Sequence, residues 1–191
     1  LLSNSVEEEI ARDFICFGAP HVTVVVTDAT SLERNLNLVL QIMEITDKVV
    51  VCVNLMDEAR RKNIDIDLLR LEKLLGVPVV GTAARNGEGL EELKTTIEKV
   101  ALGEIKTNPR KIVYEDALED AVKEIENHIE SLVENKVNSR WLSLRLIDGD
   151  SRLIKSIWEY IDFDLSKDEI LSKKLKNIKN NFQEENLGLE N

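Results

Sequence analysis

Residues 49–57 read VVVCVNLMD, a short run of apolar and mostly β-branched side chains that ends in the pattern Asn-x-x-Asp. Such a run, bounded by polar residues, predicts a strand that is buried on both faces. Asn54 stands where the strand ends, and Asp57 lies three residues later, in the loop that we expect to follow. In open α/β sheets, ligands bind beyond the carboxyl ends of the strands. We therefore expect both side chains to face a binding crevice.

The chemistry of this segment favours a guanine base. An ionised Asp only accepts hydrogen bonds, and it can take two parallel N–H donors at once. The N1–H and the exocyclic amino group of guanine form such a pair of donors, whereas adenine presents the opposite pattern on that edge. An Asn or Asp at a strand end is more often part of a turn, so the motif alone is weak. The first predicted set of base contacts is Asn54, Leu55, Met56 and Asp57.

A second strand and loop support this interpretation. Residues 77–81 read VPVVG and lead into TAARNGEGL at residues 82–90, where a helical pattern begins. In small GTP-binding proteins, a loop of this kind closes over the base, and a backbone N–H meets the guanine oxygen. Ala83-Ala84 resembles the Ser-Ala of that loop; the hydroxyl is absent here, but the backbone donor at Ala84 remains. We predict that Thr82, Ala83, Ala84 and Arg85 form the other half of a guanine site.

Composition and charge limit the classes of function. The 191 residues carry a net charge of −11, which argues against a protein that binds phosphate backbones, so nucleic acid is not an expected partner. Cys16 and Cys52 stand apart in apolar contexts and are interpreted as small core residues in a reducing compartment. The sequence shows neither a signal peptide nor a run approaching a membrane helix, and we expect this piece to be soluble.

Alternating patterns around the central run predict an α/β fold. Residues 22–28 form a second β-branched run, and the helices are expected at residues 6–17, 32–43, 67–75 and 90–100. The first helix should face a core with Val6, Ile10, Phe14 and Phe17, and the second with Leu32, Leu36, Val39, Leu40 and Met43. Gly76 occupies a natural C-terminal cap position. Strands that alternate with helices at this spacing indicate a parallel sheet with right-handed crossovers.

The character of the chain changes beyond Gly103. Residues 107–109, Thr-Asn-Pro, are typical of a linker, and no strand pattern follows. Apolar residues at helical spacing follow instead. The two tryptophans, Trp141 and Trp158, fall on the apolar faces of these expected helices, where we expect them to pack. We therefore predict a domain boundary after residue 106, with the α/β part at residues 1–106 and a small all-helical domain at residues 107–191.

Parts of a GTP-hydrolysing site are missing from the sequence. A phosphate-binding loop would read G-x-x-x-x-G-K-S/T. No Gly-Lys dipeptide occurs in the chain, and the usual metal-side Asp-x-x-Gly element is absent too. We expect that the chain begins inside the domain, so that the N-terminal part of the sheet lies outside it. By this interpretation the chain holds the half of the site that recognises the base and no catalytic residue.

Several segments resemble the ferrous iron transport protein B family. They are residues 10–14 (IARDF), 28–36 (DATSLERNL), 54–59 (NLMDEA), 84–89 (ARNGEG), 139–142 (SRWL) and 146–150 (LIDGD). The resemblance covers roughly residues 4–161, on both sides of the predicted boundary, which makes it more specific than the nucleotide motifs alone. By this match, Asn54 and Asp57 would contact the base, and Ala83 to Arg85 would close over it.

The resemblance implies a fold and a function. Members of this family are prokaryotic inner-membrane proteins that take up Fe²⁺. Each has a cytosolic P-loop GTPase-like domain and a helical domain described as slowing nucleotide release. The implied ligands are GTP and GDP, with slow GTP hydrolysis in the intact protein. Mg²⁺ is expected there too, held by residues outside this chain. The implied location is the cytoplasmic face of the inner membrane, and the implied partner is the transport region of the same polypeptide. A homo-oligomer stays open.

Two other functions remain open at this point. Another GTPase, linked to translation or ribosome assembly, would need a basic RNA-binding appendage, and the acidic composition argues against one. A non-catalytic interaction module with a degenerate GTPase fold would also lack a phosphate-binding loop. That alternative requires the natural protein to start at Leu1.

Overall fold

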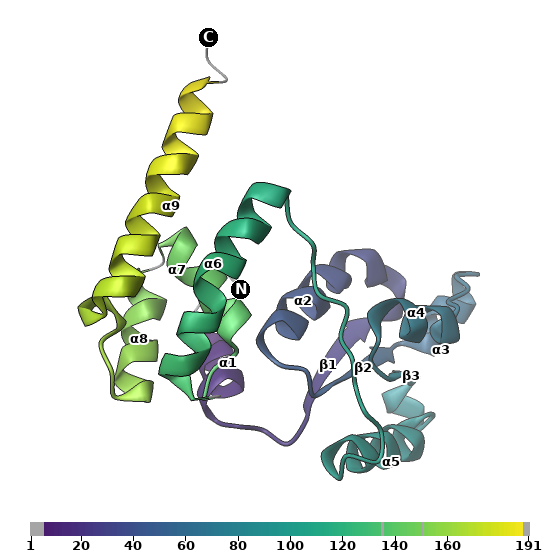
Figure 1. The fold of residues 1–191 in the computed structure, drawn as a ribbon. Helices are drawn as coiled ribbons and strands as arrows, with labels where there is room; N and C mark the ends of the chain where they lie inside the picture. Colours follow the sequence, from purple (N-terminus) through teal and green to yellow (C-terminus); the bar gives the residue numbers. More distant parts are fainter. Residues whose placement is uncertain (1–5, 135, 150, 189–191) are drawn as a thin grey trace. The chain divides into compact units, whose positions relative to one another are not determined.

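A computed structural model describes residues 6–134, 136–149 and 151–188 of the chain (Figure 1). The chain divides into two compact units, the first ending at Ile112 and the second beginning at Val113. The boundary predicted after residue 106 lies a few residues before this division and stays a prediction. Among the described helices, none is both long enough and apolar enough to cross a bilayer.

The first unit is built on a parallel sheet, as the sequence predicts, and its strands lie in the order β1-β2-β3. The strands are β1 (Thr23–Asp28), β2 (Val49–Asn54) and β3 (Val79–Gly81). The central strand β2 buries every residue from Val49 to Val53, which explains why its sequence is a continuous apolar run and does not alternate. Strand β3 begins later than predicted because Pro78 has no N–H to donate to a neighbouring strand.

Helices and short 3-10 turns connect the strands of this unit. They are α1 (Val6–Phe17), η1 (Ala29–Ser31), α2 (Leu32–Ile45), α3 (Met56–Arg61), α4 (Leu68–Leu75), η2 (Ala84–Asn86) and α5 (Leu90–Ala101). The predicted face of α2 is confirmed: Val39 and Met43 are fully buried, and Leu32, Leu36 and Leu40 pack against the same core. Helix α4 ends at Gly76, whose φ of +73° favours glycine, as the sequence predicts.

The prediction for helix α1 is partly wrong. Ile10 and Phe14 are 65% and 63% exposed, whereas Arg12 is buried and Ile15 packs against the core of the unit. The apolar residues of α1 lie on more than one face of the helix, and helical spacing alone does not say which face packs inward. The side chain of Val6 lies outside the described residues.

Both cysteines are free thiols, and Cys52 is buried in strand β2. Cys16 lies on α1 and is partly buried. Burial raises the pKa of the Cys16 thiol to about 12, so it stays protonated at neutral pH. A protonated thiol is a poor nucleophile, which agrees with its interpretation as a packing residue.

The second unit is all-helical in its described residues, as predicted. It comprises α6 (Asp116–Val133), α7 (Ser139–Asp148), α8 (Ser151–Ile161), η3 (Leu165–Lys167) and α9 (Glu169–Gly188). Its fully buried side chains among the described residues come from the α-helices and from η3, and they include Val122, Ile125, Ile129, Leu142, Ile157, Leu165 and Leu171. Trp141 is only 3% exposed and belongs to this core, whereas Trp158 is partly exposed.

An ion pair fastens the start of α6 to α7. The carboxylate of Glu119 accepts two hydrogen bonds from the Arg140 guanidinium, at 2.7 and 3.0 Å, and a third from the Tyr114 backbone N–H at 3.0 Å. The Arg140 guanidinium, followed by the Tyr114 N–H, lowers the pKa of Glu119 to about 2. The carboxylate is thus bound most tightly in its ionised form.

This pair makes the helical unit acid-sensitive. Because the folded-state pKa of Glu119 lies below the ordinary value of 4.5, its stabilising effect is complete above pH 4.5 and is lost as the pH falls towards 2. At neutral pH, Glu119→Gln should cost about 1–2 kcal/mol, since residual solvent at the pair screens part of its charge. The free energy of unfolding, measured in urea between pH 2 and 7, should fall less steeply towards low pH in the variant. The same pH dependence in the variant and the unaltered chain would contradict this role.

Candidate functional site

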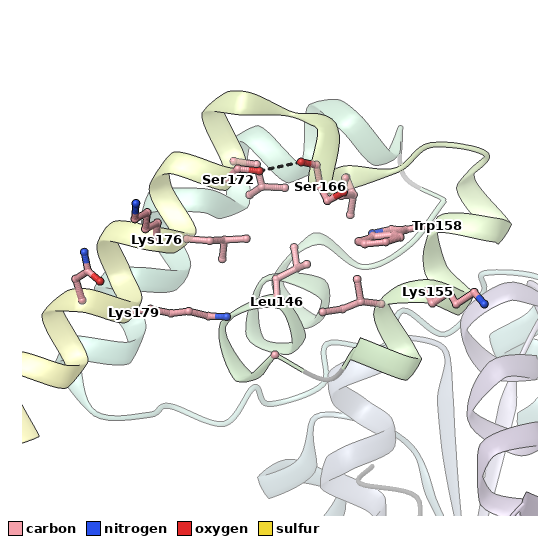
Figure 2. A pocket seen from close by; sticks show the side chains of 13 residues that line it. Leu146, Lys155, Trp158, Ser166, Ser172, Lys176 and Lys179 are labelled. Carbon is pink, nitrogen blue, oxygen red and sulfur yellow. Dashed lines mark hydrogen bonds between the residues drawn. The ribbon is translucent and has the colours of Figure 1, made fainter.

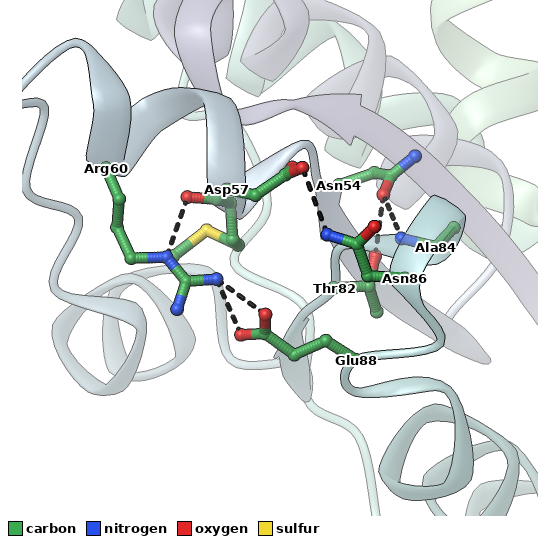
Figure 3. Close-up of polar contacts among 8 residues, drawn as sticks. Asn54, Asp57, Arg60, Thr82, Ala84, Asn86 and Glu88 are labelled. Atoms are coloured by element: carbon green, nitrogen blue, oxygen red, sulfur yellow. Dashed lines mark hydrogen bonds and ion pairs between the residues drawn. The ribbon is translucent and has the colours of Figure 1, made fainter.

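The polar centre of the first unit lies beyond the carboxyl end of β2, where Asn54 joins the two predicted loops (Figure 3). Its side-chain oxygen Oδ1 accepts hydrogen bonds from Thr82 Oγ1 and from the Ala84 backbone N–H, each at 3.1 Å. Thr82 is fully buried, so the second loop is anchored from within. No hydrogen bond to Asn54 Nδ2 occurs within the described ranges, and Figure 3 shows this nitrogen directed away from Thr82. Through this one oxygen, Asn54 thus fastens the second loop to the end of β2, and its Nδ2 remains available as a donor.

The chain turns sharply immediately after Asn54. Leu55 adopts a left-handed conformation, with φ +64° and ψ +33°, and the Met56 N–H then donates to the carbonyl oxygen of Thr82 at 3.0 Å. Helix α3 therefore begins at Met56, and Asp57 stands in its first turn. The prediction that Asp57 lies on a loop is therefore wrong. The helix is only six residues long and mostly charged, too short for an apolar period to show.

Asp57 faces the second loop across the site. Its Oδ2 accepts a hydrogen bond from Asn86 Nδ2 at 3.4 Å, near the limit for such a bond. The side chain is partly exposed, and no other hydrogen bond to its carboxylate occurs within the described ranges. The carboxylate therefore keeps most of its acceptor capacity. Nothing in the local sequence pattern indicates Asn86 as its partner.

An ion pair between Arg60 of α3 and Glu88 of the second loop also joins the two sides of the site. The Arg60 guanidinium donates to Glu88 Oε1 at 2.7 Å and to Oε2 at 2.6 Å, while its Nε donates to the carbonyl oxygen of Met56 at 3.1 Å. The second loop also closes on itself, because the Ala83 N–H donates to the carbonyl oxygen of Glu88 at 3.1 Å. Contacts within the chain thus connect both ends of the site. Sequence reasoning missed this clamp, since a charged pair so far apart in the chain has no local signature.

One glycine of the second loop is required by its surroundings. Gly89 has a φ of +75°, and a Cβ atom at this position would lie 2.2 Å from the carbonyl oxygen of Gly81. Only a residue without a side chain fits such a close approach. The predicted loop at residues 82–90 therefore folds back tightly on the end of β3.

The eight predicted site residues fall into two groups. Asn54, Asp57, Thr82 and Ala84 are brought together through the hydrogen bonds described above and through Asn86. Of the other four, Ala83 is buried and Met56 packs against the core, whereas Leu55 and Arg85 are exposed. The Ala84 N–H, predicted to meet a guanine oxygen, already donates to Asn54, so a ligand would have to share it or release it.

The left-handed turn at Leu55 stores strain that can be relieved. A non-glycine residue in this region costs about 1–2 kcal/mol, and Asn tolerates it better than Leu. Because Leu55 is 38% exposed, Leu55→Asn should stabilise the first unit by up to about 1 kcal/mol in urea unfolding. The matched change Leu69→Asn, at an exposed position of α4, should give no gain. Equal effects of the two changes would contradict the strain argument.

The fold and this site define a class of protein. A parallel α/β unit whose central strand ends in Asn-x-x-Asp, with a second loop fastened to that Asn, is typical of GTP-binding domains. The chain belongs to the ferrous iron transport protein B family. The model of that family matches residues 1–97, and the model of the FeoB cytosolic helical domain matches residues 114–190. The resemblance seen in the sequence is thereby confirmed.

Known relatives agree with this assignment. The Fe(2+) transporter FeoB of Escherichia coli K12 is 33% identical over 146 residues, which are 76% of this chain and 18% of that protein. The chain therefore spans about a fifth of the length of the curated relatives that it matches.

No group of three His, Cys, Asp or Glu side chains placed to hold a metal ion occurs in the part of the chain that the structure describes.

Solved structures of FeoB domains are similar to this chain over most or about half of its length. The cytosolic domain of the T. maritima FeoB iron transporter in GDP form is similar with a TM-score of 0.69 and 30% identity. The similarity covers 93% of this chain and 71% of that one. The FeoB G-domain of Methanococcus jannaschii is 44% identical with a TM-score of 0.52, covering 53% of this chain and 65% of that one.

Proposed function

We propose that this chain is the cytosolic nucleotide-binding and helical region of a ferrous iron transporter, in which guanine nucleotide regulates Fe²⁺ uptake. The single observation that supports the nucleotide site best is the arrangement at Asn54. One oxygen of its side chain joins the two loops, while its Nδ2 and the nearby carboxylate of Asp57 keep hydrogen-bonding capacity for a ligand. The solved relative named in its GDP form has the same architecture and supports the choice of ligand.

Each residue would have a defined part in holding the base. The Asp57 carboxylate would accept the N1–H and the amino group of guanine, displacing its long bond to Asn86. Asn54 Nδ2 would donate to an acceptor on the base, and the Ala84 N–H would be shared between Asn54 and the guanine oxygen. Leu55 and Arg85, both exposed beside these groups, would cover the faces of the ring. Adenine would place its amino group where the Ala84 N–H requires an acceptor. It would also place its unprotonated N1 where the Asp57 carboxylate requires a donor.

The phosphate side of the site would belong to another part of the intact protein. The 191 residues contain neither a Gly-Lys dipeptide nor Asp-x-x-Gly, so we propose that the phosphate-binding loop, the Mg²⁺ ligands and the hydrolytic residues lie outside this sequence. GTP hydrolysis and coupling to the membrane transport region would then be properties of the intact protein at the cytoplasmic face of the inner membrane. A homo-oligomer would be compatible with this organisation.

Calorimetric titration tests this proposal directly. GDP and ADP are titrated into the chain and, in parallel, into the intact protein. We expect GDP to be preferred over ADP in both, and to bind more tightly to the intact protein, where the phosphates would gain contacts. Equal affinity for GDP and ADP in the intact protein would overturn the assignment of the base site. Absence of binding to the intact protein would favour the non-catalytic interaction module.

A further inference from the structure

The helical unit contains a cavity that the proposed nucleotide site does not use. It has a volume of about 720 Å³ and lies among α7, α8, η3 and α9 (Figure 2). This volume is within the range of about 300–1,000 Å³ that is typical of sites for small ligands. Its walls are mainly apolar and include Leu146, Ile154, Trp158, Leu165, Leu171 and Leu175.

Among the described residues that line the cavity, the charged ones are three lysines. Lys176 and Lys179 belong to α9, Lys155 belongs to α8, and none of these described lining residues is acidic, although 36 of the chain's 191 residues are Asp or Glu. No ion pair involving these three lysines occurs in the described part of the unit. Figure 2 shows Lys179 reaching from α9 towards Leu146, whereas Lys155 lies at the opposite rim. A strongly acidic chain thus places Lys179, which has no ion-pair partner among the described residues, beside an apolar cavity.

The indole of Trp158 lies at the wall of the cavity. Its ring forms part of the wall, and its Nε1 is buried without a hydrogen-bond acceptor among the described residues. Buried indole N–H groups usually have a partner, and leaving one unpaired is unfavourable. The N–H itself has almost no accessible surface, whereas the ring at the wall can report an occupant of the cavity through its fluorescence.

We propose that this cavity binds a single-chain anionic amphiphile, with its alkyl chain among the apolar walls and its carboxylate beside Lys179. The walls come from three helices and a short turn, which suits one narrow chain better than the row of side chains that an acidic amphipathic helix would insert. Lys179 favours an anionic head, and no acidic residue among the described lining residues would repel it. This proposal is independent of the nucleotide site.

Dodecanoate below its micelle-forming concentration is the probe, with dodecyltrimethylammonium as the matched cation. The chain has two tryptophans, so Trp141→Phe leaves Trp158 as the sole fluorescent reporter at the cavity wall. We expect a saturable change in its emission with dodecanoate, at least about tenfold tighter than with the cation. Equal affinity for the two probes, or no saturable binding of dodecanoate, would overturn the proposal.

Three further variants locate the binding. Lys179→Gln should weaken dodecanoate binding about five- to tenfold, and Ser172→Phe, which fills the cavity, should abolish it. Lys173→Gln removes the same charge from α9 outside the lining and should leave the affinity unchanged. Thermal unfolding verifies that each variant is folded. Equal effects of the Lys173 and Lys179 changes, or unaltered binding by the Ser172 variant, would contradict the site. Binding to vesicles of anionic phospholipid without binding to dodecanoate would assign the lysines to a membrane surface instead.

Discussion

Trp141→Ala should lower the free energy of unfolding of the helical unit by about 3–5 kcal/mol, the range for truncating a large aromatic side chain in a core. Trp141 is 3% exposed in the first turn of α7, and the Asn138 side chain caps that helix by accepting from the Trp141 backbone N–H at 2.9 Å. The cap uses the backbone and survives the substitution. The loss therefore measures the packing of the indole and the cavity that it leaves.

Urea unfolding followed by circular dichroism measures this effect. Phe163→Ala is the matched control, because Phe163 is an aromatic residue of the same unit with 40% of its surface exposed. The control should cost less than about 1 kcal/mol. A nearly neutral result for Trp141→Ala would mean that the indole is not part of the core and would leave its burial without a stabilising role.

Asp57→Asn should weaken guanine-nucleotide binding by the intact protein by about 1–3 kcal/mol, because two donors on the base would lose their charged acceptor. An Asn side chain offers one acceptor and one NH₂ group, which matches xanthine, where an oxygen replaces the amino group of guanine. The preference should therefore shift towards xanthine nucleotide. A change in the relative affinity for the two nucleotides would come from the base alone, since guanosine and xanthosine diphosphate carry identical phosphates.

Competition between GDP and xanthosine diphosphate, followed by calorimetry, gives both affinities. Asp65→Asn removes the same charge from an exposed position outside the site and should change neither. Unchanged GDP affinity in the Asp57 variant would remove our assignment of the base contact. A loss of affinity without any gain for xanthine would point to a damaged loop, which the Arg60–Glu88 clamp should prevent.

The sequence predicted the sheet because β2 carries its signal locally. A run of buried β-branched residues between polar ones has few structural alternatives, and Gly76 marks the end of α4 through its own backbone preference. The all-helical character of the second unit and the burial of Trp141 follow from helical periodicity in the same way. These features depend on residues close together in the chain.

The features that the sequence did not reveal depend on distant partners. The clamp between Arg60 and Glu88 requires the two loops to be folded first. The left-handed turn at Leu55, which starts α3, exists because the Met56 N–H finds the carbonyl oxygen of Thr82, and no local propensity favours Leu there. Likewise, tertiary packing selected one face of α1 and left Ile10 and Phe14 outside.

The parallel register of the sheet also has a consequence for the speed of folding. It pairs Thr23 with Val49 and Val51 with Val79, so each pairing must close a loop that contains at least one helix. Neighbouring helices of the second unit, such as α6 and α7, are joined by short connections. Long loops close at a greater entropic cost, and local contacts form sooner. Refolding by dilution from urea should therefore show a fast helical phase followed by slower sheet formation. During that delay the apolar strand β2 is open to other chains, so aggregation should rise with protein concentration.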